Sequence, residues 1–270
     1  EDLPDRSRRS GLPGRLDIQP RLDPRQILFE SEGLVHVSRP LPEPPSIAEC
    51  PNLPPNFDPP AYEPQALRMW FDDQVFLRIP AANSPDDWRR FRWGYYRLTE
   101  WVDARIGELL DALDDAGVAD NTVIVFTSDH GDAAGAHRLA QKWSFYEESA
   151  HVPMIVLDPR TDRRQPACDA LVSNGLDVPA TICDAAVVPP PDAWAGRSLL
   201  PLARGESVDW RDHVVAETRL QSAHRDGRMV RTDRYKYSVF AWGHNREMLV
   251  DLQADPGEMV NLAIERRYAD

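Results

Sequence analysis

The chain has 270 residues, of which 42% are hydrophobic and 28% are charged, and its formal net charge is −13. These values suit a soluble globular protein of one large domain or slightly more. The acidic balance argues against nucleic acid as a partner, because phosphate backbones need a concentrated basic face. It leaves room for a sulfated or phosphorylated substrate, which needs only a metal ion and one or two cations in a cleft. No apolar run approaches the roughly 20 residues that span a bilayer, so we expect no membrane partner.

Proline dominates the first quarter of the chain. Residues 1–64 contain 14 of the 25 prolines. Proline neither fits the interior of a helix nor donates to the ladder of a central strand. We therefore predict an irregular, proline-rich N-terminal segment over residues 1–87.

A long amphipathic helix is predicted next. Ser84 can cap it, and Pro85 suits its first turn. Apolar residues then recur at steps of three or four and form one stripe, which predicts a helix with one buried face: Tyr95, Leu98, Val102, Ile106, Leu109 and Leu113. Gly117 is expected to end this helix.

A continuous apolar run over residues 122–127 follows the helix. It predicts a strand buried on both faces, as in a mostly parallel sheet. Polar residues directly after such a strand lie where open α/β sheets bind their ligands. A second strand is predicted over 152–157, and a helix is predicted over 171–186 with a break at Pro179.

The last quarter of the chain changes character. Short strand candidates separated by turn residues predict a small antiparallel sheet: 213–217, 228–232, 235–240 and 248–252. Within the third of them, a period of two places Tyr235 and Tyr237 on one face and Lys236 on the other. The fold class predicted is α/β, in three parts: the segment 1–87, an α/β part over 88–205 and a small sheet subdomain over 206–270.

The strongest chemical signal is the sequence Ser-Asp-His-Gly-Asp at 128–132. Asp129 offers a hard oxygen ligand to a cation, and His130 offers a nitrogen or a hydrogen bond to a bound oxyanion. Gly131 permits a turn that would let both side chains reach one ion. Such a sequence alone is equally compatible with an ordinary turn. Lys142 follows thirteen residues after Asp129 and could bind an oxyanion as a point charge.

The surrounding pattern resembles the sulfatase family of the alkaline phosphatase superfamily. The run ADNTVIVFTSDHGDAAGAHRLAQKWSFYEESAHVPMIVLDP is similar to that family's strand, metal-binding pair, lysine loop and Tyr-Glu-Glu helix. The resemblance covers about residues 88–263, and further similar segments lie in the expected order: FRWGYYRLTEWVDARIGELLDAL, LVSNGLDVPATICDAA, GRSLLPLARGE, RMVRTDRYKYSVF and MLVDLQADPGEMVNLA.

This resemblance implies a sulfuric ester hydrolase acting on small-molecule or carbohydrate sulfate esters, built on part of an alkaline-phosphatase-like mixed sheet. Asp129 and His130 would be two of four protein ligands to a divalent cation, usually Ca²⁺. Lys142 would contact the sulfate. His137 would touch the substrate or orient the lysine loop, and a purely structural role suits it equally well.

The family's nucleophile motif is missing from the sequence. That motif is Cys/Ser-x-Pro-x-Arg, whose Cys or Ser becomes formylglycine. No serine and none of the three cysteines, Cys50, Cys168 and Cys183, has these flanks. An N-terminal Asp-Asp pair that would complete the cation site is absent too. We therefore expect the C-terminal portion of a sulfatase, inactive alone, because two ligands cannot hold an ion that prefers 6–8 oxygens.

Two rival functions remain open. A phosphonate or phosphate ester hydrolase of the same superfamily would carry the same Asp-His pair and downstream lysine. A non-catalytic binding module is favoured by the missing nucleophile and disfavoured by the retention of Asp129, His130 and Lys142. The sequence predicts that these three side chains face one cleft, because the loop between them is short. The sequence leaves periplasmic, secreted and cytoplasmic locations open.

Overall fold

The computed structural model describes seven stretches of the chain, which are residues 27–29, 35–37, 46–72, 84–142, 144–161, 168–219 and 226–268. The chain forms two compact units, Glu1–Pro42 and Glu43–Asp270. The first contributes an antiparallel pair, β1 (Ile27–Phe29) and β2 (Val35–Val37). Most of the predicted irregular segment 1–87 lies outside the described residues. Its part over 46–72 is irregular except for η2 (Ile47–Glu49) and α1 (Gln65–Asp72).

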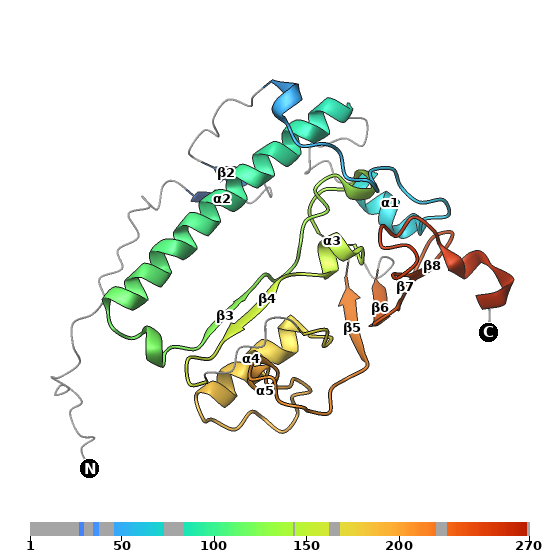
Figure 1. Ribbon diagram of the computed structural model, residues 1–270. Helices are drawn as coiled ribbons and strands as arrows, with labels where there is room; N and C mark the ends of the chain where they lie inside the picture. The colour runs from blue at the N-terminus through green and yellow to red at the C-terminus, as the bar shows by residue number, and fades with distance from the viewer. Residues whose placement is uncertain are drawn as a thin grey trace, which may run out of the picture. The chain divides into compact units, whose positions relative to one another are not determined.

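The predicted amphipathic helix is α2 (Pro85–Asp115), which Figure 1 shows in green. Its start is the one expected from the sequence. Ser84 Oγ accepts a hydrogen bond from Asp87 N at 3.2 Å, and the Asp87 carboxylate accepts one from Ser84 N at 3.1 Å. This reciprocal pair satisfies two backbone donors at the helix start. Trp88 is fully buried and packs edge-on against Phe57 and Phe91.

The apolar stripe of α2 is less buried than its period predicts. Val102 is 58% exposed and Leu109 is 52% exposed. The helix is followed by Gly117 in a left-handed conformation and by η4 (Ala119–Asn121). The buried contact of α2 is therefore concentrated in its first turns, around Trp88.

The central strands are β3 (Ile124–Thr127) and β4 (Met154–Leu157), which lie side by side in Figure 1. They pair antiparallel, with Ile124 opposite Leu157 and Thr127 opposite Met154. The expectation of a strand inside a mostly parallel sheet is wrong for the described residues, where β3 pairs with β4 alone. Nor is β3 buried on both faces, since Phe126 is 37% exposed and Ile155, opposite it, is 60% exposed. A continuous apolar run predicts a strand, but it specifies neither how far each face is buried nor the direction of the neighbouring strand.

Short helices complete this part of the chain: η5 (Ala136–Arg138), α3 (Glu147–Ala150), α4 (Asn174–Ala185) and α5 (Leu200–Ala203). The break predicted at Pro179 does not occur, because α4 continues through it. The start of α4 is held by Asp177, whose side chain is fully buried. Its carboxylate accepts hydrogen bonds from Ser173 N at 2.8 Å and from the Arg211 guanidinium.

The C-terminal antiparallel sheet is confirmed to within a residue at each boundary. Its strands are β5 (His213–Thr218), β6 (Gly227–Thr232), β7 (Tyr235–Phe240) and β8 (Glu247–Asp251), and they pair in the order β5-β6-β7-β8. The chain then forms η7 (Leu262–Ile264) and η8 (Arg266–Tyr268). In β7 the predicted alternation holds, and Lys236 is on the buried face.

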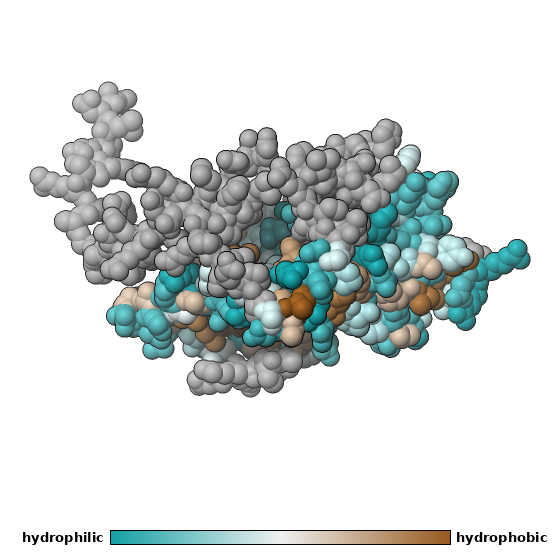
Figure 2. Space-filling model, turned by 90° about the horizontal axis from the view of Figure 1, so that it is seen from above, coloured by the Kyte–Doolittle hydropathy of each residue, from teal (hydrophilic) through white to brown (hydrophobic). Residues whose placement is uncertain are grey.

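The main hydrophobic core joins this sheet to the loops after β3. It contains Leu67 of α1, Leu139 and Phe145 of the loop region, and Phe240 and Val250 of the sheet. On the face shown in Figure 2, hydrophobic residues also reach the surface between hydrophilic ones. Within the described ranges, no helix combines the length and the apolarity needed to cross a bilayer.

Candidate functional site

The turn after β3 presents Asp129 and His130 together. The Asp129 side chain is 83% exposed, and its Oδ2 lies 3.5 Å from His130 Nε2. His130 Nδ1 lies 2.9 Å from the carbonyl oxygen of Gly131. Because a carbonyl can only accept, Nδ1 is the donor in this contact, and Nε2 is the ring nitrogen that lies next to Asp129. The turn thus offers one oxygen and one nitrogen donor next to each other.

This turn is fixed from two sides. Gly131 N donates to the carbonyl of Ser149 in α3 at 2.9 Å. Asn174, at the start of α4, donates from its side chain to the carbonyls of Ser128 at 2.6 Å and Asp129 at 3.2 Å. The role of Asn174 was not foreseen from the sequence, because its contact spans about 45 residues along the chain and follows no local period.

Gly131 is required for a different reason from the one expected. It is not among the glycines with a positive φ. A β-carbon at this position would lie 1.9 Å from the carbonyl oxygen of Glu148. The glycine therefore permits a close approach of two backbone segments, the turn after β3 and α3.

The loop from Asp132 to Gln141 folds back on itself. Ala133 N donates to the carbonyl of Gln141 at 3.0 Å, so the two ends of the loop are joined directly. Gly135 has a φ of 97°. Four loop residues that are not glycine also have a positive φ: Ala134, His137, Arg138 and Gln141. Such conformations persist only where surrounding contacts impose them. Here Arg92 donates to the carbonyl of Ala134 at 2.8 Å.

Lys142 follows the closed loop and acts electrostatically on Asp129. Slight burial raises the pKa of Asp129, but His130, nearby backbone N–H groups and the charge of Lys142 together hold that pKa below its usual value. Lys142 is thus close enough to Asp129 to affect the pKa of that carboxyl group. The prediction that all three side chains face one cleft stays a prediction.

His137 lies in the interior, fully buried. Its ring stacks on Tyr146 with centroids 3.7 Å apart. Its Nε2 lies 3.3 Å from Asn56 Nδ2, and its Nδ1 has no hydrogen-bond partner in the described part of the chain. Burial, followed by the charges of Arg68 and Lys236, lowers the pKa of His137 to about 4. The ring is therefore neutral at physiological pH, and its position supports the loop rather than the exposed turn.

The Asp129–His130 pair fits a divalent cation as part of a larger donor set. Two ligands 2.3–2.6 Å from one calcium ion and at right angles to each other are about 3.4 Å apart. The observed separation of Oδ2 and Nε2, 3.5 Å, agrees with this spacing. Within the described residues, no group of three or more His, Cys, Asp or Glu side chains is placed to hold a metal ion. The two residues can therefore contribute to a cation site, which needs further oxygen ligands.

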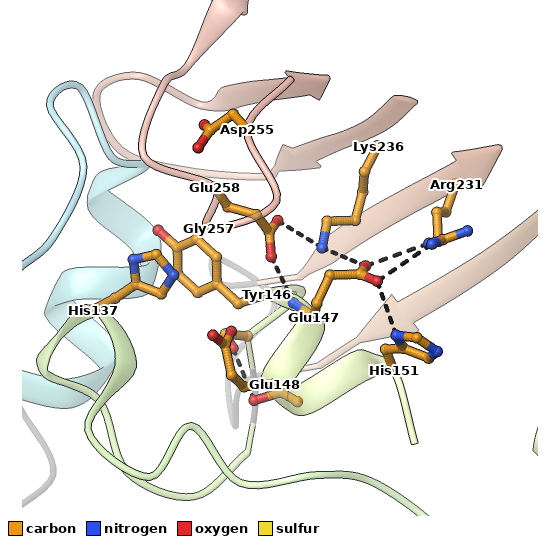
Figure 3. Close-up of polar contacts among 12 residues, drawn as sticks. His137, Tyr146, Glu147, Glu148, His151, Arg231, Lys236, Asp255, Gly257 and Glu258 are labelled. Carbon is orange, nitrogen blue, oxygen red and sulfur yellow. Dashed lines mark hydrogen bonds and ion pairs between the residues drawn. The ribbon is translucent and has the colours of Figure 1, made fainter. Parts of the chain in front are cut away.

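A second cluster of charges gathers around Glu147 of α3 (Figure 3). Lys236 Nζ lies 2.9 Å from Glu147 Oε1 and 2.6 Å from Glu258 Oε1. Arg231 and His151 approach Glu147 as well, at 3.4 and 3.3 Å. This cluster could not be predicted from local sequence, because Arg231, Lys236 and Glu258 lie 84, 89 and 111 residues from Glu147 along the chain. The alternation in β7 was the one available signal, because it set Lys236 apart from its aromatic neighbours.

One cavity lies apart from the exposed turn. It has a volume of about 840 Å³ and lies between β4, α5, β5 and β6. Its polar lining includes His151, Arg231 and Asn174, whereas Asp129, His130 and Lys142 are not part of its wall.

Comparison with known proteins assigns the family. The family model "Sulfatase" matches residues 35–188, and the model "N-sulphoglucosamine sulphohydrolase, C-terminal" matches residues 135–270. The chain belongs to the sulfatase family. The Delta 4,5-hexuronate-2-O-sulfatase of Bacteroides thetaiotaomicron is 33% identical to this sulfatase-family chain over 242 residues, covering 87% of the chain and 49% of the relative.

Solved structures agree with this assignment. A structure described as a 2-O GAG sulfatase has a TM-score of 0.76 at 31% identity, covering 91% of this chain and 52% of that one. A phosphonate monoester hydrolase from Silicibacter pomeroyi has a TM-score of 0.70 at 26% identity, covering 83% of this chain and 48% of that one. The sulfatase-family chain thus spans about half the length of these relatives.

Proposed function

We propose that the whole protein hydrolyses sulfate esters of small molecules or carbohydrates, and that this chain supplies the electrostatic part of its active site. The observation that carries the proposal is the turn after β3. It sets Asp129 Oδ2 and His130 Nε2 3.5 Å apart and within range of the Lys142 charge. This arrangement complements a sulfate group held by a cation and a lysine.

Each residue has a defined role in this proposal. Asp129 and His130 would hold a divalent cation, with calcium as the first choice, and the cation would draw electron density from the sulfate oxygens. Lys142 would bind a sulfate oxygen as an ammonium point charge and offset the charge that builds up in the transition state. The lowered pKa of Asp129 keeps its carboxylate ionised, and therefore able to bind a cation, down to acidic pH.

None of these three residues is proposed to be the nucleophile. No Cys/Ser-x-Pro-x-Arg motif is present in the 270 residues. Formylglycine is therefore proposed for the whole protein and not for this chain. The proposal for this chain is limited to binding the cation, binding the anion and holding the turn and loop that carry both groups.

A phosphonate or phosphate monoester hydrolase is the second candidate. It is favoured by the structural similarity to the phosphonate monoester hydrolase, whose TM-score is 0.70. An ammonium and a cation bind a phosphonate monoester as readily as a sulfate monoester, so the two activities need the same three residues. The choice between them depends on the leaving group and on the charge of the substrate.

The experiment compares an aryl sulfate with an aryl phosphonate as substrates of the whole protein. Higher kcat/KM for the sulfate is the expected result. A preference for the phosphonate would establish the second candidate instead. Activity on neither substrate, combined with no effect of calcium on the melting temperature, would leave the proposed hydrolase without support and favour a binding module.

Matched variants connect the activity to the site. Asp129→Ala should remove the increase in melting temperature that calcium produces, because it removes one cation ligand. Asp120→Ala, in η4 before β3, makes the same change of charge at the other end of the strand and should leave the calcium response intact. Equal loss in both variants would show that the effect is one of net charge and not of a ligand.

A further inference from the structure

The contact between the C-terminal sheet and α3 carries an inference that rests on the proposed function. We propose that Lys236 is a positioning residue, which fixes α3 through Glu147 and Glu258 and thereby sets the geometry of the Asp129–His130 turn and the Lys142 loop. Figure 3 shows Lys236 reaching from β7 to both carboxylates.

The cluster is buried and closely paired. The side chains of Lys236 and Glu258 are 4% and 2% exposed, and that of Glu147 is 19% exposed. One ammonium group therefore lies between two carboxylates, at 2.9 and 2.6 Å. Charges removed from water are held strongly to their partners, because each would otherwise be left unpaired at high cost. The positions of these three side chains are consequently interdependent.

Glu258 also binds the backbone of α3. Its Oε2 accepts a hydrogen bond from Glu147 N at 2.6 Å. The Glu258 carboxylate thus connects the sheet to α3. Its Oε1 pairs with Lys236, and its Oε2 accepts from Glu147, the first residue of α3. Without Lys236 the buried Glu258 carboxylate would lose its cationic partner and take up a proton, and its hydrogen bond from Glu147 N at the start of α3 would weaken, because a charged acceptor binds a donor more strongly than a neutral one.

From α3 the contacts continue directly to both halves of the proposed site. Ser149 O accepts from Gly131 N at 2.9 Å, next to His130. Ser149 Oγ donates to the carbonyl of Gln141 at 3.4 Å, next to Lys142. The missing side chain of Gly131 lets these backbones approach so closely that a β-carbon would lie 1.9 Å from Glu148 O. A shift of α3 therefore has to move the turn, the loop or both.

Amide hydrogen exchange tests this coupling without depending on activity. In the folded protein, Lys236→Met should speed exchange at Gly131 and Ala133 by about tenfold or more, because these amides bond to Ser149 and Gln141. Exchange within β5 and β6 should change less. The matched control is Arg234→Met, which breaks a 2.6 Å ion pair with Asp251 inside the same sheet and should leave Gly131 unaffected.

Two further variants distinguish a loss of charge at Lys236 from a general loss of folding. Lys236→Arg retains the charge and should restore most of the protection at Gly131. If Lys236→Met does not fold, Glu258→Gln replaces it, since the amide still accepts from Glu147 N but no longer carries the charge that faces Lys236. It should speed Gly131 exchange by about threefold. Unchanged exchange at Gly131 in whichever of these variants folds would overturn the positioning role.

Kinetics of the whole protein separate the two proposals. If sulfate esters are hydrolysed, Lys236→Met should lower kcat by about tenfold or more with a smaller change in KM, because the lysine loop acts mainly in the transition state. Lys236→Arg should recover most of that loss, and Arg234→Met should show none. If the parent hydrolyses no sulfate ester, the proposed function fails while the exchange result still decides whether Lys236 positions the turn.

Discussion

The stability of this protein should contain two opposing pH dependences, from His137 and Glu258. His137 is fully buried and its pKa falls from 6.5 to about 4. Glu258 is equally buried, and burial, although opposed by Lys236, raises its pKa from 4.5 to about 7. A change of this size in either pKa corresponds to about 3 kcal/mol of unfolding free energy.

The two pKa values move in opposite directions on folding, so the two groups change the stability with opposite dependence on pH. The unfolded chain binds a proton at His137 more readily than the folded one, so this contribution is present above pH 6.5 and is lost as the pH falls towards 4. The folded chain binds a proton at Glu258 more readily, so this contribution is present below pH 4.5 and is lost as the pH rises through 7. Between pH 7.5 and 5 each amounts to about 2 kcal/mol, and the two largely cancel.

Single substitutions should reveal the two pH-dependent contributions to stability that cancel in the parent. His137→Gln can still accept a hydrogen bond from Asn56 but cannot titrate, so lowering the pH from 7.5 to 5 should stabilise it by about 2 kcal/mol relative to the parent. Glu258→Gln should respond in the opposite direction by a similar amount. Urea unfolding at several pH values measures both.

Nuclear magnetic resonance gives an independent check on the same histidine. The His137 ring signals should titrate with a midpoint about 4, well below the usual value of about 6.5. If the pH dependence of unfolding is the same for His137→Gln and the parent, or if the His137 ring titrates near 6.5, then the ring is not held neutral by burial and the reasoning is wrong.

Three further substitutions should have distinct outcomes in urea unfolding. Gly131→Ala should destabilise the protein by about 1–3 kcal/mol, because its β-carbon would meet Glu148 O. Gly175→Ala should be neutral or slightly stabilising, since no described atom lies within 4 Å of the added carbon and alanine favours helix. Equal effects of the two would contradict the close approach at the turn. Asp177→Ala should cost about 3–5 kcal/mol, because it leaves Arg211 without its buried partner. A loss under 1 kcal/mol would show that Arg211 finds water or another partner.

Local sequence patterns predicted those elements whose stabilising contacts lie close together in the sequence. The cap at Ser84 and the period of α2 located the helix start, and the alternation in β7 located the C-terminal sheet. The apolar run at 122–127 correctly predicted the strand β3, but it did not predict the exposure of that strand or its antiparallel partner. Its neighbour β4 comes about 30 residues later, antiparallel.

The candidate site was predicted in part. Its position after a strand, and the order Asp129, His130 and Lys142, were visible in the sequence. The contacts that hold these residues were not visible, because they join distant segments. Asn174 fastens the turn from α4, and Lys236 reaches Glu147 across 89 residues. No local period encodes such pairs, and an isolated lysine in a strand reads as an exposed residue.

The burial of Lys236 should make the two lysines of this chain react at different rates. The chain has two lysines, at 142 and 236, and every other cationic side chain apart from histidine is an arginine. Since the Lys236 side chain is only 4% exposed and its amine is engaged by two carboxylates, an amine-reactive label should attach to Lys142 before it attaches to Lys236. Of the two lysine side chains of this chain, the proposed sulfate-binding one would therefore be labelled first. Later labelling of Lys236 would then record the opening of the ion cluster in the same sample.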